Sequence, residues 1–152
     1  MYGGYEIGTY ARRIPLEVDE QPSFGFGKYT TAWDLARLFR AVWLASDGRG
    51  PFRTTHSGLT TSDARYLLWI LDHVRDTPKL DRIVRRSSGV EVLHKAGWVD
   101  AARHDAGLVF WPGGVFVASV LTWNPRGAGV DSDVLAGHCA SAALSRFRQL
   151  HR

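Results

Sequence analysis

Residues 90–122, VEVLHKAGWVDAARHDAGLVFWPGGVFVASVLT, decide the fold. Three runs within this stretch, 90–97, 106–111 and 115–122, are short and rich in Val, Leu, Phe and Trp, a composition typical of β-strands. Pro112–Gly114 separates the last two runs and predicts a tight hairpin turn. We therefore predict three antiparallel strands in this part of the chain.

Helix signals precede these strands. Thr30 or Thr31 is a suitable N-cap, and Asp34 in the first turn favours the helix dipole. The apolar residues that follow recur at i, i+3, i+4 and i+7 and so form one helix face, namely Leu35, Leu38, Phe39 and Val42. Residues 47–51 end this helix.

The remaining elements complete a mixed α/β (α+β) fold. We predict a second helix over 61–73, a short helical turn over 80–85 and a closing helix over 131–150, whereas 1–29 lack a steady period and predict an irregular, ordered loop region. The whole chain, 1–152, is interpreted as one partial domain: helices over 30–86, a three-stranded sheet over 90–122 and the closing helix. Helices flanking an antiparallel sheet follow from this order.

Composition excludes several classes of function. The net charge is +4, but the 16 arginines are dispersed and no recognition motif accompanies them, so we predict no nucleic-acid binding. No signal peptide is recognisable at the N-terminus and no apolar run reaches the roughly 20 residues that span a bilayer, so no membrane contact is expected and the compartment stays open. Cys139 is the only cysteine, which excludes an intrachain disulfide and a cysteine metal cage. No cofactor is predicted.

Three segments, in this order, resemble the class A β-lactamases and related penicillin-recognising serine hydrolases. Residues 30–38, TTAWDLARL, are similar to the helix start that follows the family's omega loop. His94–Trp98, HKAGW, resembles the Lys-Thr-Gly strand, and 104–122 resemble the next two strands with their hairpin. The resemblance implies the C-terminal portion of a β-lactamase-like sandwich.

The resemblance also implies roles for the strand residues. Lys95 would supply positive charge to the carboxylate region of a substrate, Gly97 would let substrate lie close to the strand, and the backbone N–H of Trp98 would complete an oxyanion hole. Ala96 departs from the pattern, because the threonine hydroxyl that binds the carboxylate is missing. Arg103 or His104 would take the cationic place on the neighbouring strand.

The family's nucleophile is missing from this sequence. The residues three positions before Lys28, Lys79 and Lys95 are Gly, Asp and Val, so no Ser-x-x-Lys exists in the 152 residues. In the region that resembles the omega loop, 13–19, a proline occupies the position of the deacylating glutamate. Glu17 is the substitute carboxylate if the loop is re-registered.

Two histidines suggest other chemistry. His94 and His104 flank a possible hairpin and would invite a metal site if they met across the strands, although an ordinary strand-paired or capping histidine is favoured. His104 and Asp105 suggest part of a catalytic triad, but neighbours on a strand face opposite ways. We predict neither a metal site nor a triad.

Two functions remain. In the first, the chain supplies one wall of the cleft of a serine hydrolase that acts on β-lactams or cell-wall peptides, is inactive alone, and needs a complementing N-terminal segment that carries Ser-x-x-Lys. In the second, it is a non-catalytic interaction module or remnant that forms a homodimer through its uncovered sheet edge.

Overall fold

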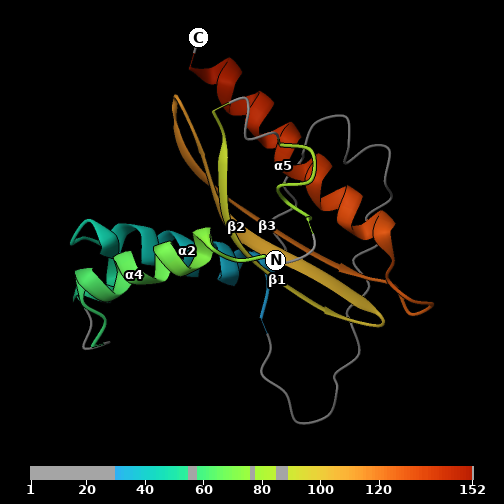
Figure 1. Ribbon diagram of the computed structural model, residues 1–152, viewed down its shortest axis with the longest axis horizontal. Helices are drawn as coiled ribbons and strands as arrows, with labels where there is room; N and C mark the ends of the chain where they lie inside the picture. Colours follow the sequence, from blue (N-terminus) through green and yellow to red (C-terminus); the bar gives the residue numbers. More distant parts are fainter. Residues whose placement is uncertain (1–29, 55–57, 76–77, 85–88, 152) are drawn as a thin grey trace.

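The computed structural model describes residues 30–54, 58–75, 78–84 and 89–151. A three-stranded antiparallel sheet separates one long helix from a group of helices on its other side (Figure 1). The elements are α2 (Ala32–Ser46), α3 (Pro51–Thr54), α4 (Thr61–Asp72), β1 (Glu91–Val99), β2 (Ala102–Trp111), β3 (Gly114–Trp123) and α5 (Val130–Leu150). The predicted class, helices flanking a three-stranded antiparallel sheet, is confirmed. None of the described helices is long and apolar enough to cross a membrane.

Reciprocal capping boxes begin both α2 and α4. The Thr31 hydroxyl accepts a hydrogen bond from the Asp34 backbone N–H, and the Asp34 carboxylate accepts one from the Thr31 N–H. Thr60 and Asp63 repeat this arrangement at the start of α4. Each box satisfies two helix-terminal donors. The choice between Thr30 and Thr31 is therefore settled in favour of Thr31.

Two tight turns set the register of the sheet. Val99 pairs with Ala102 across the first turn, and Trp111 pairs with Gly114 across the second. In the second turn a Cβ on Gly113 would lie 2.0 Å from the ring of Trp111, so any larger residue would require that ring to move. The Pro112–Gly114 hairpin is confirmed. The strands β1 and β2 extend further than predicted, because backbone pairing continues through the polar residues near the first turn.

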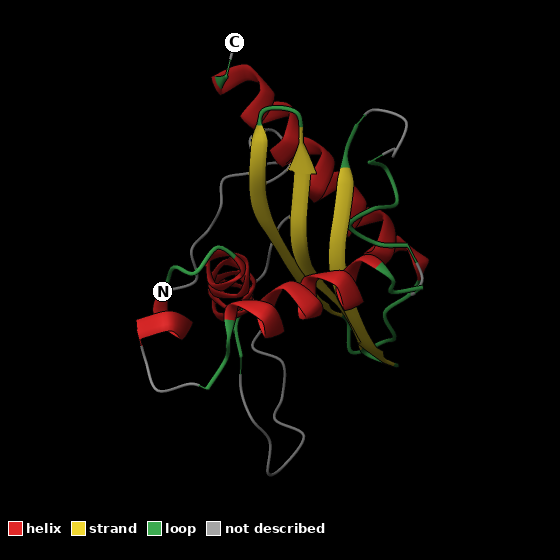
Figure 2. Ribbon diagram, turned by 60° about the vertical axis from the view of Figure 1, so that its left-hand side comes forward, coloured by secondary structure: helices red, strands yellow, loops and turns green. Residues whose placement is uncertain are grey.

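The two faces of the sheet carry separate cores. On the α5 face, Val109 and Phe116 pack with Ala136, Ala140 and Leu144 of α5. On the opposite, α2–α4 face, Ala106 and Leu108 of β2 pack with Phe39 of α2 and Leu71 of α4. Figure 2 shows the sheet with helices on both sides. Since side chains alternate along a strand, each sheet position is assigned to one of these faces.

The structure differs from the sequence-based prediction in two short segments. Residues 79–84 form an isolated turn, with the Arg82 N–H bonded to the Lys79 carbonyl at 3.1 Å, and residue 85 lies outside the described residues. The short helix α3 was not predicted, because Pro51 reads as the end of the preceding helix although proline is well tolerated in a first helical turn.

Candidate functional site

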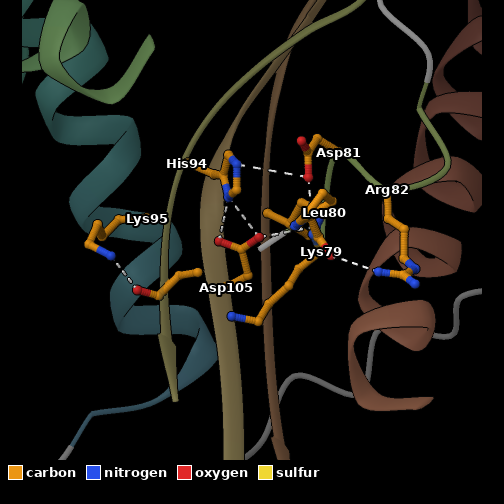
Figure 3. Close-up of polar contacts among 9 residues, drawn as sticks. Lys79, Leu80, Asp81, Arg82, His94, Lys95 and Asp105 are labelled. Carbon is orange, nitrogen blue, oxygen red and sulfur yellow. Dashed lines mark hydrogen bonds and ion pairs between the residues drawn. The ribbon is translucent and has the colours of Figure 1, made fainter. Parts of the chain in front are cut away.

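Strand β1 borders the sheet and presents its polar residues alternately to the two faces. Lys95 and Gly97 lie on the α2–α4 face and are exposed. The Lys95 ammonium donates a hydrogen bond to the Ala96 carbonyl at 2.6 Å, which holds the side chain beside its own strand. Figure 3 shows Lys95 pointing away from the polar cluster on the other side of the strand.

Open space lies next to Gly97. A Cβ added there would meet no atom within 4 Å, and the backbone of Gly97 has no positive φ that would demand glycine. Packing among the described residues therefore does not require a glycine at position 97. A ligand that approaches β1 from this face would find the backbone accessible at this position.

His104 lies directly opposite Gly97 on strand β2, on the same face as Lys95. Its Nδ1 is buried and has no hydrogen-bond partner among the described residues. Burial lowers the pKa of the imidazole; a backbone hydrogen bond with Arg103 opposes that shift and the charge of Lys79 adds to it. The neutral form of His104 is therefore favoured near neutral pH.

Arg103, the other candidate cation, faces α5. Its Nη1 lies 2.8 Å from the Asp133 carboxylate and its Nε donates to the Ala128 carbonyl at 2.9 Å. Asp133 is fully buried, so this guanidinium compensates a charge inside the protein. Of the two residues expected to supply a cation on β2, Arg103 and His104, only His104 lies on the same face of the sheet as Lys95.

Ala96 and Trp98 also belong to the α5 face. Ala96 is buried beside Asp105, its partner across the strands. Trp98 is 52% exposed, and its ring lies over the buried Lys79 ammonium at 4.5 Å. The role expected for Trp98 involves only its backbone N–H. Its side chain covers the buried ammonium of Lys79.

A buried pair, His94 and Asp105, lies behind the site and was not predicted from the sequence. His94 and His104 do not meet, because their side chains lie on opposite faces of the sheet. Across the strands His94 is paired with Gly107, and His104 is paired with Gly97. Instead, both carboxylate oxygens of Asp105 contact the His94 Nδ1, at 2.9 and 2.8 Å. If the turn had been located at Asp100–Ala101 from the sequence, alternation along the two strands would have placed His94 and Asp105 on the same face of the sheet.

The pair is tied to the turn that precedes β1. Asp105 also accepts a hydrogen bond from the Leu80 backbone N–H at 3.0 Å, and the His94 Nε2 lies 3.9 Å from the Asp81 carboxylate (Figure 3). His94 and Asp105 are nearly inaccessible, at 5% and 1% exposure. The buried side of β1 is thus cross-linked to β2 and to residues 79–81.

Comparison with known proteins identifies the fold. A family model described as the beta-lactamase enzyme family matches residues 8–147. The chain belongs to the beta-lactamase enzyme family. This confirms the resemblance carried by TTAWDLARL, HKAGW and the two following strands.

Solved structures support the same β-lactamase fold. A β-lactamase from Sphaerobacter thermophilus superposes with a TM-score of 0.65 at 20% identity, over 83% of this chain and 44% of that one. A PBP-A variant in acyl-enzyme complex with penicillin G gives 0.64 at 21%, over 79% and 40%. The TLA-3 extended-spectrum β-lactamase gives 0.59 at 20%, over 86% and 46%. A search of the curated proteins found no match.

This β-lactamase-family chain therefore spans less than half the length of the similar solved structures. Glu17, the candidate omega-loop carboxylate, lies outside the described residues. Within the described ranges no group of three or more His, Cys, Asp or Glu side chains is arranged to hold a metal ion.

Proposed function

We propose that this chain forms one wall of the active-site cleft of a β-lactamase-like serine hydrolase. The nucleophile comes from a segment outside the 152 residues, and the substrates are β-lactams or cell-wall peptides. Alone, the chain does not turn over a β-lactam. The observation that carries the proposal is the placement of Lys95, Gly97 and His104 on one face of the sheet. Lys95 and Gly97 lie on β1 and His104 on the neighbouring β2, with open space next to Gly97.

The extent of the family match supports this role. The chain corresponds to 40–46% of three similar structures, and its own sequence holds no Ser-x-x-Lys. One of those structures is an acyl-enzyme with penicillin G, which supports a β-lactam as ligand. A serine hydroxyl that attacks the lactam carbonyl must be contributed by the remainder of the fold.

Each site residue then has a defined task. The Lys95 ammonium attracts the substrate carboxylate, and Gly97 allows the substrate to lie against β1. The Trp98 N–H donates to the oxyanion that forms when the carbonyl is attacked. Ala96 offers no hydroxyl, so the carboxylate depends more heavily on Lys95 and on His104. The His94–Asp105 pair fixes β1 from behind, and preorganised donors are what such a site requires.

Complementation with a chromogenic β-lactam tests the proposal. The full chain is incubated alone and with a separately produced segment that carries Ser-x-x-Lys. We expect turnover only in the mixture, and a strong decrease with Lys95→Gln. Arg146→Gln is the matched control, since Arg146 is exposed on α5, on the other side of the sheet. Turnover by the chain alone, or an unchanged rate with Lys95→Gln, contradicts the proposal.

The alternative is a non-catalytic interaction module that forms a homodimer. Large apolar side chains exposed on α2 and α4 favour an interaction surface, namely Trp33, Leu38, Tyr66, Trp69 and Ile70. This hypothesis predicts a concentration-dependent dimer in sedimentation experiments, with no effect of Lys95→Ala on its dissociation constant. A monomer at all accessible concentrations rules the hypothesis out.

A further inference from the structure

The end of strand β1 that borders the proposed cleft is exposed. Gly97, Trp98 and Val99 all lie at the surface, and a Cβ on Gly97 would meet no atom within 4 Å. The buried pair of His94 and Asp105 holds the strand further back along β1. Any contact that these last three residues make outside the sheet therefore bears directly on the geometry of the cleft.

A lysine from the turn that precedes β1 makes such a contact with Trp98. The Lys79 ammonium lies 4.5 Å from the centroid of the Trp98 ring. Lys79 is 1% exposed, whereas about half of the Trp98 surface is exposed. A cation over the face of an indole is attracted by the electrons of the ring, and the attraction is stronger where water is excluded. The ring is therefore held from inside the protein.

The turn that carries Lys79 is itself tied to the sheet. The Leu80 N–H donates to the Asp105 carboxylate of β2 at 3.0 Å, and Leu80 is fully buried in the core on the α5 face. The Lys79 N–H donates to the Asp81 carboxylate, also at 3.0 Å. Lys79 therefore starts from a point that is fixed relative to β2, and its ammonium can fix the position of Trp98.

The backbone N–H of Trp98 faces the outer edge of β1. Val99 pairs with Ala102 across a turn of two residues, which makes them the hydrogen-bonded closing pair of the hairpin. Hydrogen-bonded and non-hydrogen-bonded pairs alternate along antiparallel strands, so the next pair, Trp98 and Arg103, is non-hydrogen-bonded. The Trp98 N–H therefore points away from β2, toward an edge that has no neighbouring strand among the described residues.

We propose that Lys79 is a positioning residue of the cleft, which holds the Trp98 N–H in place through the Trp98 ring. The inference rests on the proposed function, in which this N–H donates to the oxyanion. The Lys79 ammonium is too deeply buried to touch a substrate, so it acts through Trp98 alone. A donor that is already in place stabilises the developing charge without reorganisation during the reaction. Loss of the contact should therefore slow the chemical step more than it weakens substrate binding.

NMR relaxation of the full chain tests the contact without requiring turnover. We expect the order parameter of the backbone N–H at position 98 to be about 0.85 in the unmodified chain, as in rigid backbone, and to fall in Lys79→Leu toward the flexible range below about 0.6. Lys79→Arg should retain the higher value, because a guanidinium also stacks on aromatic rings. Trp98→Leu removes the ring at an exposed position and should give the same loss, so it decides the result if Lys79→Leu does not fold.

Arg82→Leu is the matched control. It removes a cation from the same turn, but Arg82 is exposed and its Nη1 donates to the Pro78 carbonyl at 3.3 Å. Figure 3 shows the side chains of Lys79 and Arg82 on opposite sides of the turn. Arg82→Leu should leave the order parameter at position 98 unchanged.

Kinetics in the complemented mixture test the consequence for the reaction. With a chromogenic β-lactam, Lys79→Leu should lower kcat roughly tenfold or more, as part of the 10²–10³-fold that complete loss of one oxyanion donor costs. KM should change by less than about twofold, because Lys95 still attracts the substrate carboxylate. Lys79→Arg should restore kcat, and Arg82→Leu should not affect it.

The outcomes separate the alternatives. An order parameter that stays high in Lys79→Leu and Trp98→Leu overturns the proposal, and so does an equal fall in Arg82→Leu. A mobile N–H at position 98 together with an unchanged kcat overturns it as well. If the unmodified chain gives no turnover in the complemented mixture, the proposed function is rejected, whereas the order parameter still decides whether Lys79 holds Trp98 in place.

Discussion

Asp105 holds both of its carboxylate oxygens against the Nδ1 of His94, at 2.9 and 2.8 Å, directly behind the strand that carries Lys95 and Gly97. A third contact, from the Leu80 N–H at 3.0 Å, joins the same carboxylate to the preceding turn. Because charges and donors this deeply buried are stable only when paired, the cluster fixes β1 in one position relative to β2.

Asp105→Ala should therefore destabilise the protein strongly. The change leaves a buried imidazole and a buried backbone N–H without their acceptor, and each buried donor that is left unsatisfied costs about 1–3 kcal/mol. The free energy of unfolding from urea denaturation measures the effect. Asp100→Ala is the control, because Asp100 is exposed in the turn of the same hairpin and should change stability by less than about 0.5 kcal/mol. Equal effects of the two changes would contradict the structural role of the pair.

Gly107→Ala and Gly97→Ala form a second matched comparison. A Cβ on Gly107 would lie 2.5 Å from the Leu93 carbonyl oxygen and 2.6 Å from the His94 Cβ, whereas one on Gly97 would meet nothing within 4 Å. We expect Gly107→Ala to lower stability by about 1–3 kcal/mol, because overpacking forces neighbouring atoms to shift. Gly97→Ala should leave thermal unfolding nearly unchanged and reduce β-lactam turnover in the complemented mixture. A large loss of stability in Gly97→Ala would mean that the space beside β1 is not open.

The sequence predicts the outline of this fold well, because the signals are local. A proline-glycine turn, an apolar helix face and the threonine N-cap of α2 each act over a few residues, and all three are found where they were expected. The first hairpin was harder to place. Its turn at Asp100–Ala101 carries no glycine or proline, and the polar residues that follow it do not read as a strand. Pairing with both neighbouring strands holds them in β2.

Local signals in the sequence also point to part of the candidate site. The resemblance of HKAGW to a known strand identified Lys95 and Gly97, and alternation along the strand places both on one face. That Arg103 and His104 lie on opposite faces follows only from the register and from the position of Asp133, a residue 30 positions from Arg103. Long-range contacts of this kind leave no periodic signal in the sequence.

Thr60→Ala should weaken the start of α4. The Thr60 hydroxyl accepts the Asp63 N–H at 3.1 Å, and removing an N-cap side chain costs about 1 kcal/mol. Hydrogen bonds from the Thr60 side chain, and then from its backbone, hold the pKa of Asp63 below its usual value. The contribution of Asp63 is therefore present above its unfolded pKa and disappears as the pH falls through the folded one. Thermal unfolding in acid and at neutral pH measures both effects, with Ser62→Ala as control. No effect of Thr60→Ala at neutral pH contradicts the capping role, and an effect that is the same in acid contradicts the contribution of the Asp63 carboxylate.

His104 should make stability depend on pH in the opposite sense to a paired histidine. Its folded pKa lies below the unfolded value of about 6.5, so the unfolded chain binds more protons in this range. The contribution of the neutral imidazole is present above the unfolded pKa and is lost as the pH falls through the folded pKa. His104→Gln should therefore flatten the decrease in unfolding free energy below about pH 6.5. Urea denaturation over a pH series measures this. An identical slope for His104→Gln and the unmodified chain would show that His104 does not titrate at a depressed pKa.

The same titration bears on the proposed cleft. If His104 supplies the second cation beside Lys95, lowering the pH through its folded pKa charges it, and a carboxylate substrate should then bind more tightly to the complemented mixture. His104→Gln should remove that gain while Lys95→Gln retains it, because the two side chains contribute independent charges on the same face.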